Sequence, residues 1–364
     1  MTLDTNPVVS IIVPARNEEA NIAACLESLV AQSGVPYEII VIDDDSTDRT
    51  AEIARSFPKV KLIPAGPLPD NWTGKNNAMS AGAKAAHTKA KWLLFTDADT
   101  VHQPGSLARA VAEAEQHAAA LLSYSPKQEV YGFWEKPVMP VIFAELATTY
   151  PPQAVNNPAS PIAAANGQYL MISRETYDAV GGHATIAADL LEDVALARLV
   201  KRSGRKIFFR YAPDAVRTRM YRSFAQLREG WTKNLALLFP RPRALALLRA
   251  AEFLLIVGNL TAAIWAKLSG RPNLTLQTAL LTVILSGWFA MRIRRAHFSL
   301  GSSFTAILGL PMFSYLLVRS VRLRNAGVIW KGRTYQPDAD ETSLKHHRLG
   351  ATSDRSRALD GSVN

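Results

Sequence analysis

The stretch KWLLFTDADT, residues 91–100, places two carboxylates directly after an apolar run. Residues 92–96 form a short apolar segment typical of a buried strand. Asp97 and Asp99 follow it, although repulsion and desolvation both disfavour two like charges at the edge of a core. Residues i and i+2 of an extended chain point to the same side, so both carboxylates can face one bound cation. The pattern predicts a strand that ends at a ligand-binding edge.

Strand and helix patterns alternate on both sides of this stretch. The sequence predicts strands at 8–14, 38–42, 59–65, 92–96 and 120–125, and helices at 17–34, 47–57, 76–87 and 106–118. Repeated strand–helix units with short connections indicate an α/β fold with a doubly wound, mostly parallel, Rossmann-like sheet. Ligands of such sheets bind outside the carboxyl ends of the strands, where Asp44, Asp97 and Asp99 are expected to lie.

Three acidic clusters are candidates for a functional site. They are Asp43–Asp48, the pair Asp97 and Asp99, and Glu192–Asp193 at the start of a helix predicted at 189–204, with Asp189 as its cap. Paired carboxylates suit a hard divalent ion, Mg²⁺ or Mn²⁺, that shares its shell with substrate phosphates. One cysteine and scattered histidines exclude a zinc site. Each cluster taken alone also suits a turn or a helix cap.

The C-terminal third of the chain is apolar. Stretches at about 248–266, 274–291 and 303–321 approach the length needed to span a bilayer. Three crossings would export the chain after Arg322, whereas the basic residues there favour the cytoplasmic side. A re-entrant third segment broken near Pro311, or a fourth crossing around 230–247, would remove this conflict. We therefore expect an α/β domain at 1–240, transmembrane helices at 241–325 and a polar, disordered tail at 326–364.

Residues 126–165 are rich in proline and aromatic residues and too interrupted for a spanning helix. They suit either a loop packed on the sheet or a segment that rests on the bilayer interface.

Charge and cysteine content narrow the class of protein. Lys and Arg exceed Asp and Glu by 41 to 31, and much of the excess lies beside the apolar stretches. This placement favours a membrane surface over nucleic acid, and we expect the basic residues from Arg241 to Arg249 to face anionic headgroups. The single Cys25 excludes an internal disulfide and favours a reducing compartment. The start, MTLDTNPVVS, predicts no cleavable signal peptide.

Five motifs occur in an order that resembles the family 2 glycosyltransferases. They are VSIIVPARNEEANI (9–22), EIIVIDDDSTDRT (38–50), NWTGKNNAMSAGAKAA (71–86), LLFTDADT (93–100) and LLEDVALARLVKRSG (190–204). The resemblance covers residues 8 to about 235 and is strongest to membrane-anchored members associated with hopanoid and carotenoid biosynthesis. It implies the GT-A fold, a nucleotide-sugar donor and transfer with inversion.

The resemblance also implies roles for single residues. A loop after the first strand surrounds the nucleotide and contains Pro14, Arg16, Asn17 and Glu18. Asp44 contacts the base, and Lys75 lies beside the nucleotide. Asp99 binds the metal that bridges the diphosphate, and Asp97 supports the metal and the ribose. Asp193 is the catalytic base, with Glu192 beside it and a pKa raised toward a useful range.

One departure from the family pattern bears on the product. Processive members carry a Q-x-x-R-W signature, whereas QLREGW (226–231) here is one residue longer and has Glu229 in place of the arginine. We therefore expect a single transfer. Trp231 suits either the acceptor site or an ordinary interfacial position.

The sequence thus predicts a multi-pass protein of the cell (inner) membrane whose catalytic domain faces the cytoplasm and glycosylates a membrane lipid. A polyprenyl-phosphate glycosyltransferase and a non-catalytic membrane scaffold with the same fold are the alternatives.

Overall fold

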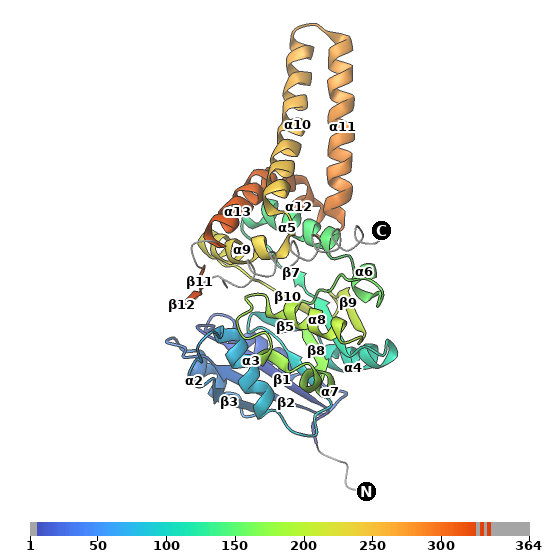
Figure 1. The fold of residues 1–364 in the computed structure, drawn as a ribbon. Helices are drawn as coiled ribbons and strands as arrows, with labels where there is room; N and C mark the ends of the chain where they lie inside the picture. The colour runs from blue at the N-terminus through green and yellow to red at the C-terminus, as the bar shows by residue number, and fades with distance from the viewer. Residues whose placement is uncertain (1–5, 325–327, 331–332, 336–364) are drawn as a thin grey trace, which may run out of the picture.

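The structure is a computed structural model that describes residues 6–324, 328–330 and 333–335. It has two parts, an α/β domain and a helical part from which two long helices project (Figure 1). Two short strands, β11 (Val328–Trp330) and β12 (Arg333–Tyr335), pair antiparallel after the last helix. The rest of the tail predicted to be disordered lies outside the described residues.

The central sheet has the strand order β3-β2-β1-β4-β8-β6-β9. Its strands are β1 (Val9–Ala15), β2 (Tyr37–Asp43), β3 (Val60–Pro64), β4 (Trp92–Phe95), β6 (Leu121–Ser125), β8 (Leu170–Ser173) and β9 (Ile207–Tyr211). Strands β1 to β4 are parallel neighbours, and β6 is parallel to β9. The predicted mostly parallel sheet is therefore confirmed.

Two strands of this sheet, β8 and β9, are missing from the prediction. Strand β8 lies between β4 and β6 and runs antiparallel to both. Its four residues, LMIS, are too few to show a periodic pattern, and only the pairing with two buried neighbours makes them a strand.

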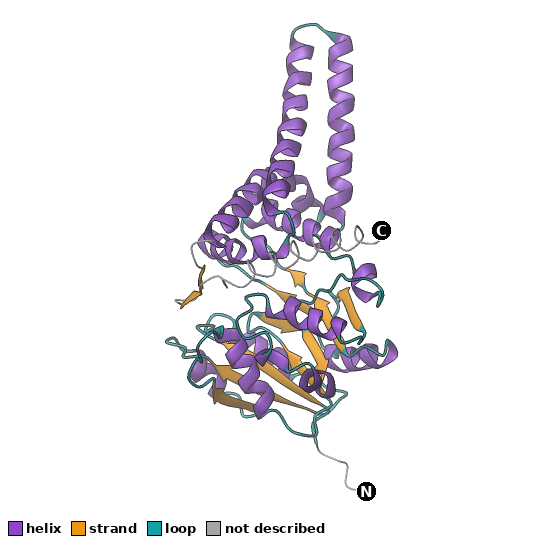
Figure 2. Ribbon diagram, in the orientation of Figure 1, coloured by secondary structure: helices purple, strands orange, loops and turns teal. Residues whose placement is uncertain are grey.

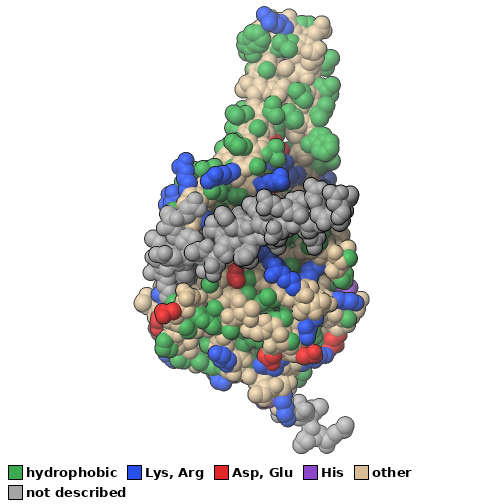
Figure 3. Space-filling model, viewed as in Figure 1, with side chains coloured by type: hydrophobic (Ala, Val, Ile, Leu, Met, Phe, Trp, Pro, Cys, Tyr) green, Lys and Arg blue, Asp and Glu red, His purple; other side chains and the backbone are tan. Residues whose placement is uncertain are grey.

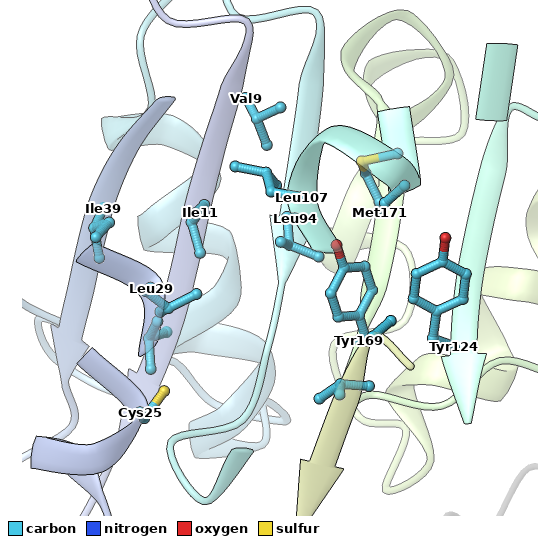
Figure 4. Close-up of a cluster of buried hydrophobic side chains, with 14 of the residues drawn as sticks. Val9, Ile11, Cys25, Leu29, Ile39, Leu94, Leu107, Tyr124, Tyr169 and Met171 are labelled. Atoms are coloured by element: carbon cyan, nitrogen blue, oxygen red, sulfur yellow. The ribbon is translucent and has the colours of Figure 1, made fainter. Parts of the chain in front are cut away.

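Helices cover both faces of the sheet (Figure 2). One face packs on α1 (Ile22–Val30), α2 (Thr50–Arg55) and α4 (Ser106–Gln116), and the other on α3 (Gly74–Ala85) and α8 (Glu192–Arg202). Alternation along β1 separates the two cores, because Ile11 and Val13 face the first and Ile12 the second. Cys25 lies in the first core beside Leu29 and Ile11, as the apolar spacing of its helix indicates (Figure 4).

A second, smaller sheet joins the domain at the acidic turn. Strand β10 (Val216–Thr218) pairs antiparallel with β5 (Thr100–His102) and parallel with β7 (Lys127–Gln128). Strand β4 ends at Phe95 and β5 begins at Thr100. The turn formed by Asp97, Ala98 and Asp99, here called the DAD turn, therefore joins the two sheets.

The proline-rich segment is largely helical, contrary to the loop interpretation, whereas its position at a bilayer interface stays a prediction. Helix α5 (Glu135–Thr149) contains Pro140 and is followed by the short α6 (Pro152–Asn156). Proline removes one helical hydrogen bond, but here the helix is buried among apolar neighbours of the C-terminal part. Tertiary packing therefore outweighs the local signal.

Two of the three apolar stretches form a projecting hairpin (Figures 1 and 2). Helices α10 (Pro242–Leu268) and α11 (Pro272–Arg294) pack on each other, and the 27 residues of α10 extend about 40 Å. Only 6% of the most apolar window of each is buried in the protein. Figure 3 shows mainly hydrophobic side chains along the hairpin, with Lys and Arg gathered at its base.

The third stretch is long and apolar enough to cross a membrane, yet 47% of its most apolar window is buried in the protein. It is broken into α12 (Leu300–Thr305), a 3₁₀ turn (Ala306–Leu308) and α13 (Gly309–Arg324). Helix α13 packs on α5, α10 and α9 (Phe224–Leu238). A Cβ at Gly309 would collide with the Pro137 carbonyl oxygen, so α13 and α5 touch closely there. The break before Pro311 agrees with the broken-segment alternative.

Four charged residues form a closed network at the base of the hairpin. Arg249 of α10 lies 2.9 Å from Glu145 of α5 and 2.9 Å from Glu252, and Arg292 of α11 lies 3.2 Å and 2.7 Å from the same two acids. Their side chains are at most 16% exposed. The expectation that Arg249 faces lipid headgroups is therefore wrong, because the cost of burying its charge is offset by these acids.

Candidate active site

Lys75 brings together three distant segments at the carboxyl edge of the sheet. Its Nζ atom lies 2.7 Å from Oδ1 of Asp97 and 2.6 Å from Oε1 of Glu192. Asp97 follows β4, and Glu192 is the first residue of α8. Although burial opposes its charge, the two carboxylates raise the pKa of Lys75. Lys75 therefore stays cationic and holds the DAD turn against the start of α8.

The position of Lys75 follows from the cap of its helix. Thr73 is the N-cap of α3, and its side chain accepts a hydrogen bond from the Asn76 backbone N–H at 3.1 Å. Lys75 thus lies in the first turn, at the end of α3 that faces the acids.

Asp193 lies beside this ion pair and has a perturbed acidity. Burial and the neighbouring Glu192 carboxylate raise the pKa of Asp193 to about 6, as the sequence indicates. The Gly167 backbone N–H donates to its Oδ2 at 2.9 Å. A Cβ on Gly167 would come within 3.1 Å of Glu192 Oε1 and 3.3 Å of Lys75 Nζ, so a larger residue there would push these two side chains outward by a few tenths of an ångström.

The carboxyl group of Glu192 differs from that of Asp193 in its ionisation. Burial opposes its charge, but the Lys75 ammonium prevails and lowers the pKa of Glu192. Two adjacent carboxylates are thereby driven apart in acidity, so Asp193 is the one suited to exchange a proton near neutral pH.

The loop after β1 lies next to the loop after β2. It contains, together with the end of β1, the residues to which the family resemblance gives a role in nucleotide binding, Pro14, Arg16, Asn17 and Glu18. The Arg16 guanidinium donates to the Asp44 carbonyl oxygen and lies 4.0 Å from its carboxylate. Asn17 accepts from the Thr47 N–H at 2.8 Å, and the Glu18 N–H donates to Thr50 Oγ1 at 2.7 Å. Pro14, half-buried, precedes this group at the end of β1.

The predicted start of the first helix, at residue 17, needs correction. The first helix begins at Ile22, and Asn17 precedes it with a positive φ of 53°, a conformation that asparagine tolerates. Lys75, through its ion pairs with Asp97 and Glu192, lies between the DAD turn and α8, and its place beside the nucleotide stays a prediction.

Asp97 and Asp99 border different hollows. Asp97 lines a large cavity with Lys75, Glu192 and Asp193, whereas Asp99 lines a smaller pocket of about 240 Å³ with Arg219 and Arg222. Antiparallel pairing of Thr218 with Thr100 places Arg219 across from Asp99. These arginines belong to none of the motifs in the sequence, and the alternation in VRTRMYR (216–222) is their only signal.

The acids offer few protein ligands for a metal. Among the residues that the structure describes, no group of three or more His, Cys, Asp or Glu side chains is placed to hold an ion. Two carboxylates with oxygen donors nevertheless fit a hard divalent cation that takes its remaining ligands from substrate phosphates and water.

The large cavity, about 860 Å³, leads from the acids to the base of the hairpin. Its far wall combines α5, α9 and the segment after α11, including Phe143, Leu146, Tyr150, Leu238 and Phe298. Trp231 lies in this wall, 3% exposed, with its Nε1–H directed at Met139 Sδ at 3.3 Å and its ring edge-to-face with Phe143.

Lys233 of α9 lines the same cavity and is absent from the sequence-based set. Burial lowers its pKa, while Glu192, Asp97 and Asp193 act in the opposite direction. A single lysine in an amphipathic helix gives no signal in the sequence.

Comparison with known proteins identifies the α/β domain. Residues 10–181 match the family model for glycosyl transferase family 2. The 4,4'-diaponeurosporenoate glycosyltransferase of Staphylococcus haemolyticus (strain JCSC1435) is 32% identical over 245 residues, which cover 64% of this chain and 62% of that protein. Its counterpart in Staphylococcus aureus (strain MRSA252) is 28% identical over 350 residues, 92% of this chain and 90% of that protein.

A solved structure has the same fold at low sequence identity. A mannosyltransferase from Pyrobaculum calidifontis, in complex with GDP-Man and Mn²⁺, matches with a TM-score of 0.50 and 17% identity over 87% of each chain. The family match therefore places the α/β domain, over residues 10–181, in glycosyl transferase family 2, and the structural similarity gives it a GT-A fold, which apolar helices follow.

Proposed function

We propose that the chain transfers a sugar, with inversion, from a nucleotide-diphosphate sugar to a hydroxyl or carboxyl group of a membrane lipid. The observation that carries this proposal is the single cavity that extends from Asp193 to the base of the apolar hairpin. A water-soluble acceptor would need no apolar passage between the catalytic acids and the bilayer. The names of the relatives support a carotenoid-type acceptor first, and the resemblance adds a hopanoid type.

Asp193 is the proposed base. It takes the proton of the acceptor hydroxyl as that oxygen bonds to the anomeric carbon and the bond from this carbon to the diphosphate breaks. Attack from the face opposite the leaving group inverts the anomeric centre. The Gly167 N–H and the neighbouring Glu192–Lys75 pair hold the carboxylate in place.

The donor is assigned to the other side of Lys75. Asp44, Arg16 and the loop that contains Pro14, Asn17 and Glu18 would surround the nucleoside, with Asp97 toward the ribose. The loop-to-loop hydrogen bonds between residues 16–18 and 44–50 support a preformed nucleoside site. Arg219 and Arg222, beside Asp99, would add positive charge next to the diphosphate.

Asp97 and Asp99 would hold the divalent cation, Mg²⁺ or Mn²⁺. When bound there, such an ion neutralises the charge that develops on the departing diphosphate.

Helices α10 and α11 are the proposed membrane anchor. Two crossings return the chain to the side on which it entered, which leaves the α/β domain and the end of α13 on one side. Exposed arginines at the base of the hairpin, Arg241, Arg243, Arg294 and Arg295, favour the cytoplasmic side of the cell (inner) membrane. Each contributes about 1 kcal/mol near an anionic surface. In this arrangement the third stretch, with 47% of its most apolar window buried in the protein, does not cross the membrane, which would remove the conflict over orientation.

The rate of transfer to a hydroxyl acceptor is expected to fall as the pH drops through about 6, the value to which burial and Glu192 raise the pKa of Asp193. The carboxylate must be ionised to accept a proton, so the rate is retained above this pH and lost below it, by about tenfold per pH unit. The dependence of kcat on pH, measured at saturating donor and acceptor, shows this decline as the acidic limb of the profile. Donor affinity over the same pH range is the control. An acidic limb near the ordinary carboxyl value of 3.8 would contradict the assignment.

Transfer is expected to require lipid acceptors presented in vesicles. Purified protein, labelled nucleotide sugars and Mn²⁺ are incubated with vesicles of extracted membrane lipids, with lipid-free detergent micelles as control, and label is counted in the lipid fraction. An acid-labile sugar phosphate as product would favour the polyprenyl-phosphate alternative. Efficient labelling of a soluble sugar or peptide, with none in the lipid fraction, would overturn the lipid assignment and leave the hairpin as an anchor only.

A further inference from the structure

The Asn76 side chain hydrogen-bonds to residues 186–189, the segment that precedes helix α8. Its Nδ2 group lies 2.8 Å from the carbonyl oxygen of Ile186, 3.0 Å from that of Ala187 and 3.0 Å from that of Asp189. The Thr73 backbone N–H adds a hydrogen bond to Ala187 O at 2.8 Å. Asn76 is fully buried, and its Oδ1 atom has no hydrogen-bond partner among the described residues. The side chain therefore acts here as a donor to backbone carbonyls.

Helix α8 lacks a side-chain cap of its own. The expectation that Asp189 caps this helix is wrong, because α8 begins at Glu192 and its N-cap is Leu191, which makes no capping hydrogen bond through its side chain. A helix start without such a cap is less well fixed by its own sequence. The position of Glu192 and Asp193 consequently depends on what holds residues 186–189.

The first turn of α3 thus makes two sets of contacts with α8 and the segment before it. Lys75 pairs with the Glu192 side chain, and Asn76 holds the backbone before it. We propose that Asn76 is a positioning residue for sugar transfer: by holding residues 186–189 it sets the distance between Asp193 and the donor bound at the DAD turn. This inference rests on the proposed function of the site.

The neighbouring Asn77 supplies a matched control. It is also buried in α3, but its Nδ2 group donates to Ala65 O at 3.3 Å and Pro67 O at 3.4 Å, in the connection that follows β3. Its replacement removes the same amide from the same helix without releasing residues 186–189.

The test compares Asn76→Ala with Asn77→Ala in the full-length protein. Asn76→Ala is expected to lower kcat by about 10²-fold, because a small displacement of a catalytic group has an effect of this size. Donor affinity should stay within about twofold, since only the catalytic step depends on this position. Asn77→Ala should retain the wild-type kcat.

The pH profile separates positioning from a general loss of structure. Asp193 is faced by Glu192 on its own helix, by Lys75 of α3, by Lys233 of α9 and by Tyr150 at the end of α5. Loosening residues 186–189 admits water to this group, so the acidic limb of Asn76→Ala should move to lower pH, while that of Asn77→Ala stays in place.

Some outcomes would overturn the inference. An unchanged kcat and acidic limb in Asn76→Ala would do so, as would an equal loss in Asn77→Ala. Asn76→Ser keeps a donor in a smaller side chain and serves as the test variant if Asn76→Ala fails to bind donor. Absence of transfer by the wild-type protein with every acceptor would count against the proposed function instead.

Discussion

Replacing Asp193 by asparagine is expected to lower the rate of sugar transfer by about 10²- to 10⁴-fold. Asparagine keeps the size of the side chain and an oxygen that can accept the Gly167 N–H, but it cannot take up a proton from the acceptor. Donor binding should change little, because Asp193 lines the cavity on the α8 side of Lys75. Single-turnover transfer with labelled donor measures the loss, and calorimetric titration of the donor checks binding.

Glu192→Gln is the informative companion to this variant. It removes the carboxylate that pairs with Lys75 and that helps to raise the pKa of Asp193. We expect transfer to persist in Glu192→Gln, with its acidic limb shifted to lower pH. If Asp193→Asn instead transferred sugar at nearly the wild-type rate, the base would lie elsewhere, and Glu192 would be the first candidate.

Replacing Asp99 by alanine is expected to abolish the part of nucleotide-sugar binding that depends on a divalent cation. The protein offers few carboxylates for the ion, so losing one should weaken metal-dependent binding by about 10²-fold or more. The fold should remain, since Asp99 lies in the turn between β4 and β5 and outside both cores of the sheet.

Calorimetry with Mn²⁺ and with EDTA measures this effect. Asp178→Ala, which removes an exposed carboxylate of α7 (Arg174–Ala179), controls for the change in net charge. Equal donor affinity of Asp99→Ala and the wild type in Mn²⁺ would remove Asp99 from the metal site.

The alternating pattern of the first 125 residues was sufficient to predict the parallel half of the sheet. Each strand there is a run of apolar residues between turn signals, and each helix has its own apolar face, so local periodicity carries the information. Strand β8 and helix α5 were not predictable in this way. The first is too short for a period, and the second contains Pro140, so their structures depend on neighbours distant in the sequence.

Some residues of the candidate site can be recognised from the sequence, and others only from the fold. Asp97 and Asp99 stand out in the sequence because two like charges directly follow an apolar run, and Glu192 and Asp193 because they belong to the ordered set of motifs, although the roles of all four remain predictions. Lys233, Arg219 and Asn76 carry no such signal. Each became a candidate only through its neighbours in the fold. Lys233 lines the same cavity as the acids, Arg219 lies across a strand pair from Asp99, and Asn76 contacts three carbonyl groups before α8.

The sequence by itself determined the family resemblance, the α/β class and the presence of long apolar helices, because these depend on local composition and on the order of motifs. The tertiary structure decided which charges meet. Lys75 pairs with two acids that lie 22 and 117 residues further along the chain, and Arg249 pairs with Glu145 rather than with lipid headgroups. Ion pairs and hydrogen bonds act over a few ångströms in space, whereas spacing in the sequence reports only the neighbours along one helix or strand.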